Sequence, residues 1–113
     1  MEYIMATKIL KMRSGEEIIS NITEKFAGEK VVAYTMRNPC MLIPMPNKGG
    51  GASIAIVPWM ASVKQGQGFD VPVDAVLFTG DPMDELGNEY NEAFGSGLIV
   101  PNKMVASSLK LSI

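Results

Sequence analysis

Apolar and polar positions alternate along most of the chain, and this period of two predicts β-strands. Leu10 and Met12 alternate with Lys11 and Arg13, and further along Ile18 and Ile22 share one face of a second segment. The predicted strands are 7–13, 16–26, 31–45, 53–63 and 73–79. Gly-, Pro- and Asn-containing turns separate them. A mainly β fold of five strands follows.

Two of these strands carry additional information. Asn38-Pro39 interrupts the third strand, and we expect a bend there because proline donates no ladder hydrogen bond. A long bent strand is what a small sheet needs to curl into a barrel. The last strand, 73–79, is apolar on both faces and is expected to be buried on both sides.

A single helix is predicted over 81–95. Asp81 is the expected N-cap, Pro82 the first helical residue and Gly95 the stop. One face of this helix is apolar and consists of Met83, Leu86, Tyr90 and Phe94. The remaining residues form a C-terminal extension, 96–113, in which the apolar cluster 98–100 or 109–111 is a candidate edge strand.

The chain length of 113 residues fits a single domain, with a barrel over 7–80, the helix over 81–95 and the extension over 96–113. Pro58 interrupts the longest uncharged apolar run, which is too short to span a membrane as a helix. Glu2 stands where a signal peptide would carry basic residues. We therefore expect a cytoplasmic protein.

Composition excludes several kinds of chemistry. One cysteine, Cys40, and no histidine allow neither an internal disulfide, nor a Cys/His zinc site, nor a histidine-dependent nucleophilic centre. Gly49 to Gly51 lacks the Lys-Ser/Thr of a phosphate-binding loop. The acids between Asp81 and Glu92 fit no EF-hand and suit a helix N-terminus. We predict no metal, no cofactor and no catalysis, a paired-carboxylate hydrolase being the alternative.

Charge is divided unevenly along the sequence. Residues 1–69 hold eight basic and five acidic side chains, whereas residues 70–113 hold two basic and seven acidic ones. The first part is therefore mildly basic, although the whole chain carries a net charge of −2. This excess is far below the footprint of a strong nucleic-acid binder, so no DNA duplex is expected as a partner.

The segment from Leu10 to Thr79 resembles the Sm/LSm superfamily of small five-stranded barrels, which are strongly bent and SH3-like. Gly15, Ile18, Ser20 and Ile22 fit the start of the family's first motif, with Ser20 in place of the usual glycine. The strings at 14–19, 38–39, 58–60 and 71–72 are similar to small Sm-like proteins of marine cyanophages. For a phage protein the expected location is the host cytoplasm.

This resemblance implies a non-enzymatic, cyclic homo-oligomer of about five to seven subunits, closed by pairing the fourth strand of one subunit with the fifth of the next. It also implies single-stranded RNA as a partner. The family's base-contacting positions fall on Lys25, Phe26, Glu29 and Lys30, and none of the usual residues is retained.

Two hypotheses remain open. In a shifted RNA site, Phe26 stacks on a base and basic or polar side chains face the backbone; the candidates are Lys25, Lys30, Lys64, Gln65 and Gln67. In the alternative, the protein is a phage assembly or protein-binding scaffold without RNA, Phe26 covers the mouth of the barrel and the lysines are merely solvated. Candidates for the subunit interface are Trp59, Met60, Val76 and Phe78.

Overall fold

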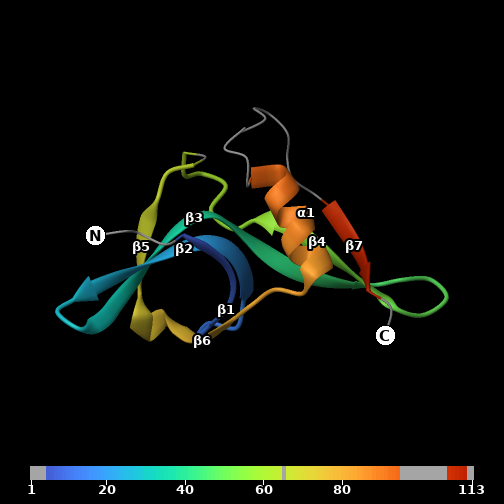
Figure 1. Cartoon of the computed structure of the whole chain (residues 1–113). Coiled ribbons are helices and arrows are strands. Elements are labelled where there is room, and N and C mark those ends of the chain that lie inside the picture. Colours follow the sequence, from blue (N-terminus) through green and yellow to red (C-terminus); the bar gives the residue numbers. More distant parts are fainter. Residues whose placement is uncertain (1–4, 65, 95–106, 112–113) are drawn as a thin grey trace.

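The computed structural model describes residues 5–64, 66–94 and 107–111. Figure 1 shows a mainly β protein with one helix lying against part of a long, bent sheet, which confirms the predicted class. The elements, in chain order, are β1 (Ala6–Met12), β2 (Glu17–Ala27), β3 (Lys30–Pro46), β4 (Ala52–Pro58), β5 (Phe69–Pro72), the 3₁₀ helix η1 (Val73–Ala75), β6 (Val76–Gly80), α1 (Asp84–Phe94) and β7 (Ser107–Leu111).

All strand pairs are antiparallel and follow the order β6-β1-β2-β3-β4-β7, with β5 paired to β3 beside this path. The path begins at β6 and ends at β7, so the expected closed barrel is not formed by hydrogen bonds among the described strands. The physical reason lies between β5 and β6: Pro72 donates no hydrogen bond, and η1 turns the chain before β6 reaches β1. The result is a strongly bent, open sheet.

One face of the bent sheet encloses a first core. Leu10 and Met12 from β1, Ile18 and Ile22 from β2, and Met36 from β3 are buried in it. Val71 of β5 and Val76 of β6 complete this core. The alternating side chains on which the first strands were predicted are therefore those that fill it.

The opposite face carries a second core, which α1 covers. Ile19, the neighbour of Ile18, points to this side and is fully buried. Further along the sheet, α1 lies against β3 and β4 (Figure 1). Its Leu86, Tyr90 and Phe94 are buried, as the sequence predicts for the apolar face of the helix. Two adjacent isoleucines are both buried because β2 has a core on each side.

A β-bulge joins the two halves of β3. Ile19 pairs with Cys40 but Asn21 pairs with Arg37, so β3 contains one extra residue at Asn38-Pro39. Asn38 has a positive φ of 52°. The extra residue reverses the alternation of side chains, and Met41 therefore packs against the same core as Met36. The predicted bend is confirmed, within a single strand of 17 residues.

Two buried hydroxyls satisfy the backbone of the bulge. Ser20 donates to the Arg37 carbonyl at 3.0 Å. The Tyr90 hydroxyl donates to the carbonyl of Asn38 at 2.8 Å, lies 3.1 Å from that of Arg37, and accepts the N–H of Asn21 at 3.1 Å. The helix is thereby attached to the bulge by hydrogen bonds as well as by apolar contacts.

Three sequence predictions about element boundaries are wrong. The strand expected over 73–79 is η1 followed by β6, and only Val76 is buried in β6. The strand expected over 53–63 ends at Pro58. The helix expected to start after an N-cap at Asp81 begins instead at Asp84. Its first hydrogen bond runs from the Gly87 N–H to the Met83 carbonyl at 2.9 Å, and Asp81 forms an ion pair with Lys8.

The C-terminal extension supplies an additional edge strand. The cluster 109–111 lies in β7, which pairs with β4 from Ala52↔Leu111 to Ile56↔Ser107. The other candidate cluster, 98–100, and the expected stop at Gly95 lie outside the described residues. Within the described part of the chain, no helix has the length and apolarity needed to cross a membrane.

Candidate functional site

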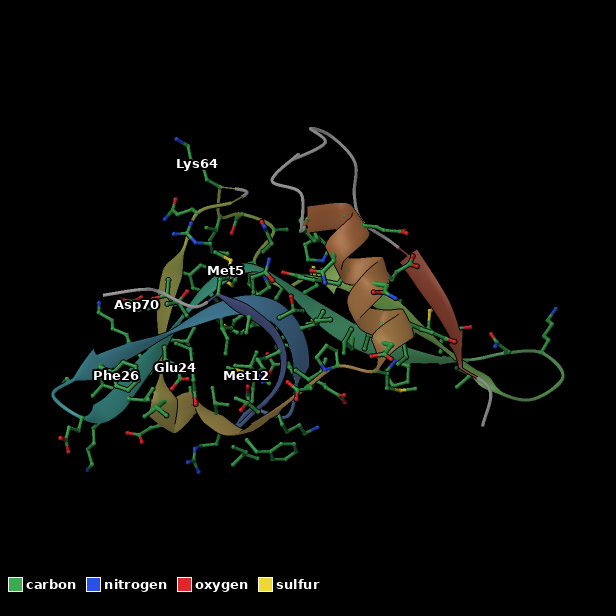
Figure 2. The ribbon with its side chains drawn as sticks, viewed as in Figure 1. Met5, Met12, Glu24, Phe26, Lys64 and Asp70 are labelled. Atoms are coloured by element: carbon green, nitrogen blue, oxygen red, sulfur yellow. The ribbon has the colours of Figure 1, made fainter. Side chains whose placement is uncertain are left out.

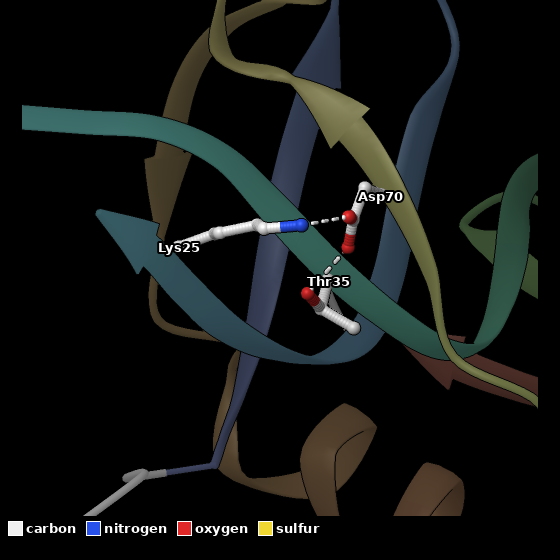
Figure 3. A network of polar contacts seen from close by, with 3 residues as sticks. All are labelled: Lys25, Thr35 and Asp70. Atoms are coloured by element: carbon white, nitrogen blue, oxygen red, sulfur yellow. Dashed lines mark hydrogen bonds and ion pairs between the residues drawn. The ribbon is translucent and has the colours of Figure 1, made fainter. Parts of the chain in front are cut away.

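Lys25, the first of the expected RNA contacts, is already held by an intramolecular partner. Its Nζ lies 2.6 Å from Asp70 Oδ2, and Thr35 donates to the other carboxylate oxygen at 2.7 Å (Figure 3). The pKa of Lys25 is raised, mainly by its hydrogen bond to Asp70. The pKa of Asp70 is lowered, mainly by the hydrogen bond from Lys25. The lysine thus links β2 to β5 across β3.

Phe26 and Lys30 lie at the tip of the β2–β3 hairpin. Phe26 is 54 % exposed and is not part of either core, so it does not close the mouth of a barrel. Lys30 opens β3 opposite Ala27 and is exposed. This tip brings two of the predicted RNA contacts, Phe26 and Lys30, close together.

Lys64 and Gln67 belong to a different part of the surface. Both are exposed on the loop that connects β4 to β5, while Gln65 lies outside the described residues. Figure 2 places Lys64 well away from Phe26, at the opposite side of the bent sheet. The five candidates that the structure describes therefore form no single surface.

Most other basic side chains near the sheet have intramolecular partners. Lys8 pairs with Asp81, and Lys11 donates to the Gly15 carbonyl at 2.9 Å. Arg13 donates to the Asp74 carbonyl at 2.8 Å, and Arg37 donates to the Gly66 carbonyl at 2.9 Å. Because these four cations already bind groups of the same chain, few basic side chains remain to contact the phosphate groups of a nucleic acid.

Trp59 belongs to the fold more than to the surface. It is half-buried against the first core, and its ring centroid lies 6.3 Å from that of Phe69. Its indole N–H donates to Glu16 at 3.2 Å. The pKa of Glu16 is lowered, mainly by the Ser14 hydroxyl and to a smaller extent by this indole. Met60, the next residue, is exposed.

Two buried side chains, Cys40 and Tyr90, have raised pKa values. Burial raises the pKa of the Cys40 thiol to about 12 and also raises that of the Tyr90 phenol, so both are neutral at pH 7. In the described ranges, no three acidic or cysteine side chains gather as a metal site would require.

The clearest surface feature is the strand β6, at one end of the sheet path. Its outer edge has no partner among the described strands. Leu77 is 53 % and Phe78 64 % exposed, and we call these two residues the β6 patch. Of the other interface candidates, Val76 is buried in the first core. In the sequence this patch belongs to the uncharged apolar run of 75–78, from which we predicted a strand buried on both faces.

A second uncovered apolar surface lies on the hairpin formed by β3 and β4. Ile43 pairs with Ala55 and Met41 with Val57, so these side chains share the face opposite α1. Ile43 is 39 % and Met45 49 % exposed, and Ala55 and Val57 are half-buried. We call Ile43, Met45, Ala55 and Val57 the β3–β4 face. The alternation of apolar residues predicted these strands, but it did not indicate which of their faces would stay uncovered.

Comparisons with known proteins identify no family or relative from which a function could be inferred. No protein-family model matches the chain, and no curated protein matches it either.

Proposed function

We propose that this protein is a non-enzymatic assembly domain of the Sm-like type, which associates with copies of itself into a cyclic homo-oligomer of about five to seven subunits. The wrapping of β1, β2, the first half of β3, β5 and β6 around one core supports the Sm-like resemblance. Its function is to present a protein scaffold rather than to transform a substrate.

One observation carries this proposal: β6 is an unpaired strand edge that also exposes Leu77 and Phe78. A free edge offers unpaired N–H and C=O groups, and natural proteins normally protect such edges with charges, prolines or bulges. Residues 76–80 contain neither charge nor proline. The pairing with β1 does have a bulge at Leu77, since Lys11 pairs with Phe78 and Met12 with Val76. An edge of this kind is therefore stabilised when another chain covers it.

The scaffold form is better supported than the RNA-binding form. Lys25 is paired with Asp70, Lys64 is distant from Phe26, and four further cations bind within the chain. A single exposed lysine beside an aromatic residue gives few of the phosphate contacts that dominate binding to nucleic acid. We therefore infer that protein partners, beginning with identical subunits, occupy the exposed apolar surfaces.

Sedimentation velocity at micromolar concentration tests the assembly. We expect one species with about five to seven times the 12.2 kDa mass of the chain. Phe78→Asp should dissociate it, whereas Phe26→Asp, which changes a similarly exposed aromatic residue away from β6, should leave it assembled. A wild-type monomer would overturn the proposal.

Fluorescence anisotropy with oligo(U) and oligo(A) tests the choice between scaffold and RNA binder. We expect no saturable binding at micromolar protein. Saturable binding that weakens as salt rises, and that Lys30→Gln reduces, would instead establish the RNA-binding form.

A further inference from the structure

We infer that the outer edge of β6 in one subunit pairs with the outer edge of β7 in the next, so that a continuous sheet runs through the assembly. This inference rests on the proposed function and names the two strands that meet. The partner at each edge is a second copy of this chain. The strand β7 belongs to the C-terminal extension, which lies outside the segment that carries the Sm-like resemblance.

The hydrogen-bonded path through the sheet has two open ends. It begins at β6 and finishes at β7, and neither strand has a described strand on its outer side. Figure 1 shows β6 beneath β1 and β7 beyond β4, so the two edges of one chain do not reach each other. Two different open edges on one chain are what a head-to-tail contact requires, and repetition of such a contact by rotation closes a ring.

The edge of β4 is not available to a neighbour in this structure. One side of β4 is paired with β3, and the other side is paired with β7 from Ala52 to Ile56. The resemblance implied that the fourth strand would meet the next subunit, but here β7 occupies that position. The first open edge beyond β4 is therefore the outer edge of β7.

Prolines in the ladder between β3 and β4 reveal the direction of the β4 backbone. Pro44 and Pro46 of β3 pair with Ile54 and Ala52. Proline has no N–H, so these pairs exchange no hydrogen bonds, and the N–H and C=O of Ala52 and Ile54 point the other way, toward β7. Pro58 of β4 lies at the same alternate position, as this direction requires.

The same alternation determines the outer edge of β7. Ala52 and Ile54 pair with Leu111 and Leu109, so these two leucines direct their N–H and C=O toward β4. The N–H and C=O of Ser108, the residue before Leu109, therefore point outward. A partner strand on this side would bond to Ser108 without disturbing the ladder between β4 and β7.

The outer edge of β6 includes the backbone of Thr79. Just after β1, the Arg13 N–H donates to the Ala75 carbonyl on the β6 side. Because backbone direction alternates along a strand, Lys11 also faces β6, whereas Leu10 faces β2. Thr79 pairs with Leu10 and thus exchanges no hydrogen bond with β1. Its N–H and C=O point outward, where the next subunit's β7 is placed.

Single prolines at these outward positions test the contact. Thr79→Pro and Ser108→Pro each remove one outward N–H and place a ring against the neighbour, while the hydrogen bonds within the subunit remain. Each variant should assemble at least about tenfold more weakly and sediment as a monomer at micromolar concentration. An equimolar mixture should form a 1:1 dimer, because the intact β7 of one variant meets the intact β6 of the other.

Hydrogen exchange reports the pairing directly. In the assembled wild type the amides of Thr79 and Ser108 should be protected. In the monomeric Thr79→Pro variant the Ser108 amide should exchange freely, while that of Leu109, which is bonded to β4, stays protected. Thr79→Ala and Ser108→Ala keep the N–H and should assemble like wild type.

The outcomes separate this contact from the proposed assembly itself. Circular dichroism and thermal unfolding check that each variant is folded. If Ser108→Pro assembles like wild type, if the mixture stays monomeric, or if the Ser108 amide exchanges freely in the assembly, the inference is overturned while the proposed ring stands. A monomeric wild-type protein would overturn both.

Discussion

Replacing Tyr90 with phenylalanine tests how strongly the helix is tied to the bulge in β3. The substitution keeps the ring in the second core and removes only the hydroxyl. The Asn21 N–H then loses its 3.1 Å acceptor, and the Asn38 carbonyl loses its 2.8 Å donor and keeps only the weak donor of the Cys40 thiol at 3.6 Å. The Arg37 carbonyl keeps Ser20. A buried polar group without a partner costs about 1–3 kcal/mol, so we expect a loss of about 2–3 kcal/mol in the free energy of unfolding.

Urea unfolding followed by the fluorescence of Trp59, the only tryptophan, measures this loss. The corresponding fall in melting temperature should be about 10 °C or more for a domain of this size. Tyr34→Phe is the matched control, because no intramolecular hydrogen bond of its hydroxyl is among the described contacts, and it should change stability by less than about 0.5 kcal/mol. Both variants are compared with wild type at one protein concentration. A change below about 0.5 kcal/mol for Tyr90→Phe would refute the reasoning.

Three further predictions concern the cores and the surface pair. Leu86→Ala should destabilise the protein by about 2–5 kcal/mol in the same urea assay, because it opens a cavity in the second core. The Cys40 thiol should react with a maleimide only at the rate of unfolding, as mass spectrometry can follow, and fast labelling of the folded protein would show that it is accessible. Folding lowers the pKa of Asp70, so its contribution to stability is present above the pKa of an unfolded aspartate and is lost as the pH falls through the folded pKa. In Lys25→Met the pKa of Asp70, measured by carboxyl-carbon NMR, should rise toward its ordinary value, and an unchanged pKa would contradict the pairing.

The second strand was predictable because its own residues specify it. Ile18 and Ile22 share one face of the strand that follows the turn at Gly15, and this local period predicts the strand. It does not predict the second core, which buries Ile19 on the other face. The buried face of α1 was equally local, since Leu86, Tyr90 and Phe94 recur at helical spacing. These elements follow from periodicity within one segment.

The segment 73–79 shows what periodicity cannot supply. Val76 is buried because Leu10 and Met12 lie beside it in the first core, whereas Leu77 and Phe78 have no strand beyond them. An apolar strand has the same sequence pattern whether it lies at the edge or in the centre of a sheet. Its position depends on which other strands pair with it, and those strands come from distant parts of the chain.

The candidate RNA site failed to gather for a related reason. Lys25 was counted as a free cation, but Asp70, 45 residues later, lies against it through the pairing of β3 with β5. Lys64 sits on a loop whose position depends on Arg37 and Asn38, which bind Gly66. Tertiary contacts of this range determine which charges are free, and sequence order alone does not reveal them.

The single extra residue at Asn38-Pro39 also sets which changes in length the gene can tolerate. Deleting one residue there would restore simple alternation along β3, and Met41 would turn toward the helix while Leu42 turned away from it. The tip at Gly49 and Gly50 has nothing within 4 Å of where a side chain would begin. Insertions and deletions should therefore accumulate at this tip and be absent from the bulge, so that β3 keeps a fixed length while the loop beyond it diverges.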